Sequence, residues 1–150
     1  MVRITPATEA DVEELLARMR AADRIECDAT GVEGWEAGLF DAARAGVMCW
    51  AARAGDRLLC LFGATRIADG IGAVWMLGTD ELVHFSKRLM KTVPGYLQQM
   101  LDAFPVLMNF VHASNRTSVQ WLRRLGFRLF PAEPYGKHGQ LFHRFEMRRQ

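Results

Sequence analysis

The stretch Pro105–Phe130, PVLMNFVHASNRTSVQWLRRLGFRLF, decides the fold. Its apolar run Val106–Val111 has the length and the β-branched and aromatic residues typical of a strand. Ser114 and Asn115 come next, and their side-chain oxygens can accept hydrogen bonds from the free N–H groups at a helix start. The following helix is amphipathic and ends at Gly126, which can adopt the left-handed conformation that closes many helices. The stretch therefore predicts a strand, a capped helix and a second strand.

The predicted helix has two different sides. Three residues, Ser118, Leu122 and Leu125, form one stripe, and Val119 and Trp121 flank it. The other side is polar and carries Arg116, Gln120, Arg123 and Arg124. With Arg128 these arginines form a basic edge, which is usually solvated but could contact phosphates or an acidic partner.

Length and composition are those of one ordinary globular domain, residues 1–150. Hydrophobic residues make up 50% and charged residues 24% of the chain, which is long enough to bury about two-thirds of its unfolded surface. The formal net charge of +2 gives no reason to expect nucleic acid or an anionic membrane as a partner. The longest stretch without Asp, Glu, Lys or Arg, Ala103–Asn115, is too short to span a bilayer.

Cysteine usage and the first residues both indicate a cytoplasmic protein. The three cysteines, Cys27, Cys49 and Cys60, have no metal-type spacing and cannot all pair, so we expect reduced thiols. No apolar run with a small-residue cleavage site follows Arg3, as it would in a signal peptide.

The remaining elements follow from periodicity and turn residues. Strands are predicted at Val2–Thr5, Val47–Ala54, Leu58–Ile67, Ile71–Leu77 and Gln140–Met147. Helices are predicted after Thr8, from about Trp35 to Gly46, after Thr79 and over Tyr96–Phe104, with Pro94-Gly95 as an interruption. Asp23–Gly31 and Pro131–Gly139 are predicted as loops. The predicted order is β, α, α, β, β, β, α, β, α, β, β.

This order resembles that of the GNAT acyltransferase family. In that family an Asn opens the helix after strand 5 and a Leu-Gly-Phe closes it, and this chain has Asn115 and Leu125-Gly126-Phe127 at the matching spacing. The resemblance covers nearly the whole chain. It implies an α/β (α+β) fold with a mixed, mostly antiparallel sheet flanked by helices. It also implies transfer of an acetyl group from acetyl-CoA, or of another acyl group from acyl-CoA, to an amine of a small molecule or protein.

The resemblance also implies where the cofactor lies. In the family its pantetheine arm pairs with strand 4, which here implies Met76, Leu77 and Gly78. Asn115 and Ser118 match family positions that line the same arm. Both residues also have ordinary capping and packing roles, and either reading is compatible with the sequence.

The pyrophosphate loop departs from the family pattern. The usual motif is Arg or Gln, two residues, Gly, one residue, and Gly or Ala, but the corresponding stretch 80–91, DELVHFSKRLMK, contains no glycine. The side chains of His84, Ser86, Lys87 and Arg88 could contact the phosphates instead. Equally, they could form a solvated helix face.

Two residues are candidates for the general base that an ammonium substrate requires. His112 is one, because histidine titrates near neutral pH, although it could be a core histidine bonded to backbone. Glu26 is the other, at a place where family members contact substrate, although it could be a solvated loop carboxylate. Many family members protonate the leaving thiolate with a Tyr seven residues after the Asn, where this chain has Leu122. Tyr96, Tyr135 or a water could substitute, and the sequence does not choose among them.

Several stretches resemble a narrower branch. DRIECDATG, AVWMLGT, LMNFVHASN and WLRRLGF are similar to a GNAT-related family of short-tailed phages, whose members are described as acetyltransferases or as internal virion proteins. The resemblance leaves two functions open. One is an N-acyltransferase, supported by the retained Asn115. The other is a phage protein without the chemistry, acting through a virion or host protein, supported by the missing glycines and by Leu122. We favour the transferase, and a homodimer through the final strand stays open.

Overall fold

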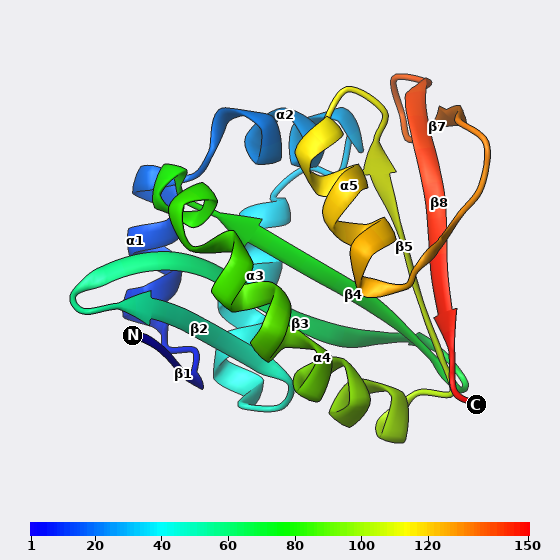
Figure 1. Ribbon diagram of the computed structural model, residues 1–150. Coiled ribbons are helices and arrows are strands. Elements are labelled where there is room, and N and C mark those ends of the chain that lie inside the picture. Colours follow the sequence, from blue (N-terminus) through cyan, green and yellow to red (C-terminus); the bar gives the residue numbers. More distant parts are fainter.

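The computed structural model describes residues 1–150 and shows one twisted sheet with helices on both faces (Figure 1). The strands are β1 (Val2–Pro6), β2 (Cys49–Ala54), β3 (Arg57–Ala68), β4 (Ile71–Gly78), β5 (Val106–His112), β6 (Arg128–Leu129), β7 (Glu133–Tyr135) and β8 (Gln140–Arg148). The helices are α1 (Glu9–Arg18), α2 (Ala21–Ala29), α3 (Trp35–Ala45), the 3-10 helix η1 (Asp80–Phe85), α4 (Ser86–Ala103) and α5 (Arg116–Leu125).

The sheet has the strand order β1-β2-β3-β4-β5-β8-β6, and β7 also pairs with β8. Every neighbouring pair is antiparallel except β4 and β5, which run parallel. The predicted class, a mixed and mostly antiparallel sheet flanked by helices, is confirmed. Because β8 is paired on both of its sides, it offers no free edge to a second copy of the chain.

Two apolar cores cover the two faces of the sheet. The larger one lies against α4 and α5 and includes Leu89, Leu97 and Val119. The other lies against α1 and α3 and includes Val12 and Leu39. In Figure 1, α4 and α5 lie in front of the sheet, with α1 and α3 behind it. A ligand between the central strands can therefore reach side chains from both layers.

The segment predicted as the polar loop Asp23–Gly31 is mostly helix α2, so that prediction is wrong. Not all of its polar side chains are solvated. Asp23 is only 2% exposed, and its carboxylate accepts hydrogen bonds from Arg20 Nη1 (3.1 Å) and Gly78 N–H (2.8 Å). Internal partners for a polar side chain are formed by distant segments, and local composition cannot reveal them.

The predicted interruption at Pro94-Gly95 is also wrong, because α4 runs without a break from Ser86 to Ala103. A proline inside a helix removes one backbone hydrogen bond and costs about 3 kcal/mol. The neighbouring Val93 and Leu97 are 3% and 5% exposed, so both sides of the proline are anchored in the larger core. Burial of these side chains offsets the cost.

The chain shows no arrangement typical of a membrane span or a metal centre. No helix combines the length and the apolar character needed to cross a bilayer. No three or more His, Cys, Asp or Glu side chains are grouped as a metal site. All three cysteines are free; Cys49 and Cys60 are buried and Cys27 is partly buried.

Candidate active site

The central feature of the sheet is the place where its two parallel strands separate. The ladder between β4 and β5 ends after the pair Ala73 and Met108. There the side chain of Asn109 replaces the next backbone pair: Nδ2 donates to Val74 O (2.9 Å), and Oδ1 accepts from Phe110 N–H (2.8 Å). A side-chain amide can satisfy both strands without holding them at ladder spacing, and β4 and β5 diverge beyond it.

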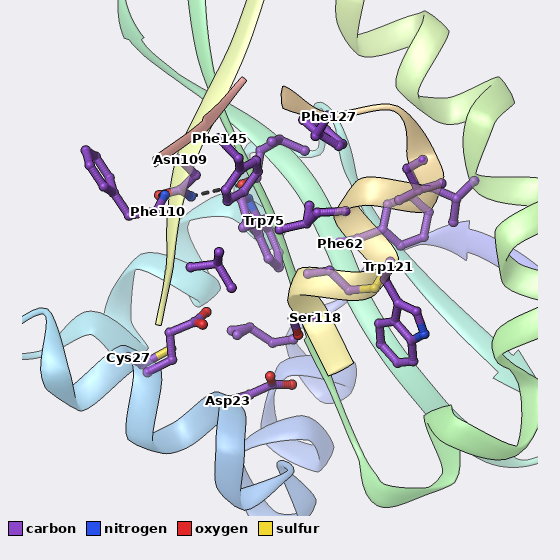
Figure 2. Close-up of a pocket in the computed structure, with 18 of the residues that line it drawn as sticks. Asp23, Cys27, Phe62, Trp75, Asn109, Phe110, Ser118, Trp121, Phe127 and Phe145 are labelled. Carbon is purple, nitrogen blue, oxygen red and sulfur yellow. Dashed lines mark hydrogen bonds between the residues drawn. The ribbon is translucent and has the colours of Figure 1, made fainter. Parts of the chain in front are cut away.

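A cleft of about 410 Å³ occupies the opening between the separated strands, as Figure 2 shows in close-up. Its walls are mainly apolar and come from both layers of helices. The side of α5 that faces it carries Ser118, Trp121, Leu122 and Leu125. The predicted stripe of Ser118, Leu122 and Leu125 lines the cleft and is only partly buried, whereas Val119 and Trp121 are the buried residues of α5.

The backbone of β4 has free hydrogen-bonding groups that face this opening. Gly78 N–H donates to Asp23 and Gly78 O accepts from Arg20 N–H (2.8 Å), so the amide groups of Gly78 are directed away from β3. Met76 and Gly78 are two residues apart, and both are in register with β3. Because these directions alternate along an antiparallel strand, the N–H and C=O of Met76 also face the opening. They are available to pair with a ligand that lies along the strand.

A buried polar cluster lies at the mouth of the opening. Both oxygens of Asp23 are occupied by the bonds to Arg20 and Gly78. Asn115 Nδ2 donates to Asp23 Oδ1 and to Glu26 Oε1, both at 3.3 Å. Glu26 Oε1 further accepts the backbone N–H of the last β5 residue (2.8 Å). Glu26 Oε2 has no hydrogen-bond partner, so this oxygen can receive a proton or bind a cation.

Burial shifts the proton affinity of both carboxyl groups. Burial raises the pKa of Glu26 to about 7; the hydrogen bond from His112 N–H opposes the rise and the charge of Asp23 adds to it. Burial also raises the pKa of Asp23, opposed by the charge of Arg20. A carboxyl group that titrates near neutral pH is suited to act as a general base.

The thiol in the cleft has a different chemistry. Cys27 lines the wall beside Glu26. Burial raises the pKa of Cys27 to about 12, and the charges of Glu26 and Asp23 add to the rise. The thiolate is the nucleophilic form, so Cys27 is not an activated nucleophile at neutral pH.

Solved structures with the same arrangement identify the fold. PaiA N-acetyltransferase from Thermoplasma acidophilum in complex with coenzyme A superposes with a TM-score of 0.68 and 14% identity, over 99% of both chains. An acetyltransferase of the GNAT family from Streptococcus pneumoniae gives a TM-score of 0.66 and 14% identity over 100% of both chains. This chain has the GNAT fold. The ribosomal-protein-alanine N-acetyltransferase of Brucella melitensis is also similar, with a TM-score of 0.65, 15% identity, and 98% and 99% of the two chains covered.

Sequence comparison adds a similarity to a phage protein family. The sequence model of a family described as "Bacteriophage T7, probable scaffold protein Gp13" matches residues 62–133, a little under half of the chain. No curated protein sequence gives a significant match. The matched range runs from β3 into β7 and includes both strands that form the opening. These findings are consistent with the phage-related GNAT branch expected from the sequence.

The structure places the two candidate bases of this GNAT fold differently. Glu26 lines the cleft. The ring of His112 does not: Nδ1 accepts from Ser114 N–H (3.1 Å), Nε2 lies 2.6 Å from Gln140 Oε1, and the ring stands edge-on to Phe142. Only the backbone N–H of His112 reaches the cluster, through Glu26 Oε1. The geometry therefore favours Glu26.

The cofactor residues expected from the sequence fall into three groups. Three of them line the cleft: Met76, Leu77 and Ser118. Two adjoin it through Asp23: Gly78 and Asn115. The last three are exposed around the start of α4: His84, Lys87 and Arg88. The first two groups come together at the strand opening, and the third lies outside the cleft.

Asn115 has a different role from the one its position predicts. It is the N-cap residue of α5, but its side chain makes no capping bond and reaches the carboxylates of α2 instead. Its Oδ1 is the one fully buried side-chain nitrogen or oxygen in the chain without a hydrogen-bond partner. A buried acceptor without a hydrogen-bond partner lowers the stability of the folded protein. The cluster therefore has one acceptor beside Glu26, Asn115 Oδ1, that is available for a further hydrogen bond.

Sequence reasoning missed Asp23, Arg20 and Asn109. One signal could have found the first. Asp23 and Glu26 are three residues apart and would share one face of a helix, but the polarity of the segment predicts a loop. Asn109 has no local signal, because it occurs inside an apolar strand and acts only across to β4.

Proposed function

We propose that this protein is an N-acyltransferase that moves an acetyl group from acetyl-CoA, or another acyl group from acyl-CoA, to the amine of a small molecule or protein. The observation that carries the proposal is the free Oε2 of Glu26 at the opening between β4 and β5. There a proton acceptor lies beside a strand with unpaired backbone groups. The GNAT fold, shared with an N-acetyltransferase in complex with coenzyme A, supports it.

Groups of this chain are suited to bind two parts of coenzyme A, the pantetheine arm and the phosphates. The N–H and C=O of Met76 would pair with the amide groups of the pantetheine arm, as an added strand would. α4 begins at Ser86, directly after η1, and the dipole of its first turn favours an anion. Lys87 and Arg88 are exposed and form no ion pair. Their positive charges can therefore bind the phosphates in place of the backbone contacts that a glycine loop would make.

Glu26 is the base in this mechanism. The backbone of Met76 holds the pantetheine arm, and Asn115 holds the carboxylate of Glu26. Acetyl-CoA is the acyl-donating substrate: after the ammonium has lost one proton, the neutral amine attacks the thioester carbonyl carbon and a C–N bond replaces the C–S bond. The nitrogen then loses a second proton to solvent, and the departing thiolate takes up one proton to become the CoA thiol. Glu26 Oε2 accepts a proton from the incoming ammonium so that its nitrogen gains a free electron pair. Asn115 keeps the carboxylate in place through Oε1. Leu122 supplies no acid, so the proton for the thiolate comes from Glu26 or from water.

Release of the CoA thiol in the presence of acetyl-CoA and an amine panel tests the proposal. The wild-type protein should release thiol only when an amine is present. Glu26→Gln keeps an oxygen for His112 N–H but cannot accept a proton, and kcat should fall about 100-fold or more. Glu13→Gln, an exposed glutamate on α1, is the matched control and should be fully active. No amine-dependent release from the wild type would refute the proposal.

A second function is favoured by one observation. Residues 62–133 match a family described as a probable scaffold protein, and the chain lacks the glycine loop and has Leu122 where a proton donor is common. On this alternative the protein keeps the fold and binds a phage or host protein, in the virion or in the host cytoplasm. The alternative requires that the folded chain show neither stabilisation by coenzyme A nor thiol release.

A further inference from the structure

The cleft has two sides that differ in their walls, because side chains alternate along β4. Val74 belongs to the core against α4 and α5. Trp75 and Leu77 belong to the core against α1 and α3. We call the second side the acceptor chamber and define it by six cleft-lining residues: Trp35, Gly38, Leu39, Ala42, Trp75 and Leu77.

The acceptor chamber presents apolar surface without free polar groups. Trp35 donates its Nε1–H to Asp28 Oδ1 (3.0 Å), so only its ring faces a ligand. Arg24 lies over that ring at 5.8 Å, and its guanidinium donates to Leu16 O (2.6 Å), which ties it to the end of α1. The four residues of α3 have the spacing i, i+3, i+4 and i+7 of one helix face. The walls therefore match an apolar or aromatic body.

Only one charge in the cleft is left for a ligand. The charged residues lining it are Arg20, Asp23 and Glu26, and the first two form an ion pair with 10% and 3% exposed side chains. Glu26 forms no ion pair and has a free Oε2. A ligand that brought a second charge into the chamber would bury it unpaired, which is strongly unfavourable.

The chamber is limited in length at the end of α2. Thr30 lines the cleft, and its carbonyl accepts Lys137 N–H (3.1 Å) from the turn between β7 and β8. Gly136 packs so closely that an added Cβ would lie 2.9 Å from Thr30 O. Phe110 and Tyr135 stack beside this contact with ring centroids 3.7 Å apart. The wall here is fixed by backbone contacts, so we expect a small ligand.

We propose that the acceptor is a small monoamine whose ammonium group binds Glu26 Oε2 and whose aromatic or branched aliphatic body fills the acceptor chamber. This inference rests on the proposed function, which places acyl-CoA along the Met76 backbone and at the start of α4. The transfer step and its protons are those written above. Polyamines, amino acids and hydroxylated amines are disfavoured, because each brings a polar or charged group to a wall that cannot pair with it.

Gly38 allows a test that does not weaken the fold. A Cβ added at Gly38 would have no heavy atom within 4 Å, and the residue has no positive φ. Because Gly38 lines the cleft, we expect the added side chain of Gly38→Leu to take up space in the chamber. The change also replaces a poor helix former with a good one. Gly95→Leu in α4 is the matched control, because Gly95 is also helical, exposed and unobstructed but does not line the cleft.

The experiment measures thiol release with acetyl-CoA and four probes: 2-phenylethylamine, isoamylamine, ethanolamine and putrescine. We expect kcat/KM for the first two to exceed that for the last two at least tenfold in the wild type. Gly38→Leu should lose at least tenfold with 2-phenylethylamine and keep the thermal shift given by coenzyme A, and Gly95→Leu should match the wild type. Equal or better use of ethanolamine or putrescine would overturn the acceptor class and leave the transferase standing.

Binding without turnover separates the two proposals. Trp35 and Trp75 lie in the chamber, so 2-phenylethylamine should quench tryptophan fluorescence in the absence of acyl-CoA, and Gly38→Leu should abolish the quenching. Quenching without any effect of coenzyme A would overturn the transferase and support the amine site. If 2-phenylethylamine neither quenches nor serves as an acceptor, the amine site is overturned, whatever coenzyme A does.

Discussion

Glu26→Gln should make the protein more stable while making it inactive, and the size of the effect should depend on pH. The carboxyl of Glu26 has an ordinary pKa of 4.5, and burial raises it to about 7 in the folded chain. A rise of this size corresponds to about 3 kcal/mol, because each unit is worth about 1.4 kcal/mol. The folded protein therefore favours the protonated carboxyl, and ionising it opposes folding.

The sign of the pH dependence follows from this linkage. Below pH 4.5 Glu26 is protonated in both states and has no effect on stability. As pH rises from 4.5 to 7 the unfolded chain releases its proton first, so the wild type loses stability across this window. The glutamine side chain of the variant cannot ionise but keeps an oxygen for His112 N–H and Asn115. The stability gained by the variant should grow from under about 1 kcal/mol at pH 5 to about 3 kcal/mol at pH 8.

Urea unfolding at pH 5, 6, 7 and 8, with the same m-value for both proteins, measures this difference. Asp23 also has a raised pKa, but it is present in both proteins and cancels to first order. A variant that is equally stable at all four pH values, or one less stable by a constant amount, would refute the burial of an ionisable Glu26. Loss of activity together with a gain in stability is expected where a site is kept polar for function.

Three further predictions follow from the same geometry. His112→Gln should keep activity within about twofold from pH 6 to 9, because its ring is bonded outside the cleft; a larger loss in steady-state assays would return the histidine to the mechanism. Asn115→Ala should lower the free energy of unfolding by about 1–3 kcal/mol, because the buried Asp23 and the partly buried Glu26 lose a donor. It should also weaken acyl-CoA binding measured by calorimetry, and unchanged affinity would contradict its role beside the opening. Replacing Lys87 and Arg88 together by Gln should raise the dissociation constant of coenzyme A several-fold at low salt and less at high salt, whereas a salt-independent affinity equal to that of the wild type would place the phosphates elsewhere.

The parts of the fold that were predictable have strong local signals. Gly126 adopts φ 99° at the end of α5, and Phe127 N–H bonds back to Leu122 O (3.0 Å), as the Leu-Gly-Phe sequence indicates. Alternating side chains and glycine turns likewise marked the strands β2, β3, β4 and β8. These features depend on neighbours a few residues apart, so a single sequence contains them.

The polar cluster could not be predicted because its bonds join distant segments. Asp23 and Gly78 are 55 residues apart, and Glu26 and His112 are 86 apart. A carboxylate satisfied by such partners has the same local sequence as a solvated one, and the polarity of DRIECD therefore predicts a loop. The resemblance to the GNAT family gave Glu26 as a candidate, but only the three-dimensional contacts separate its free Oε2 from the fully bonded Asp23.

Thermal unfolding with and without acetyl-CoA and free coenzyme A tests the central claim, that the opening between β4 and β5 binds acyl-CoA, most directly. Ligand at a hundredfold excess over its dissociation constant stabilises a protein by about 2.7 kcal/mol. For a domain of this size the midpoint should rise by about 5 to 11 °C with both ligands. No shift with either ligand at millimolar concentration would contradict the transferase and leave a GNAT-fold protein that acts by binding another protein.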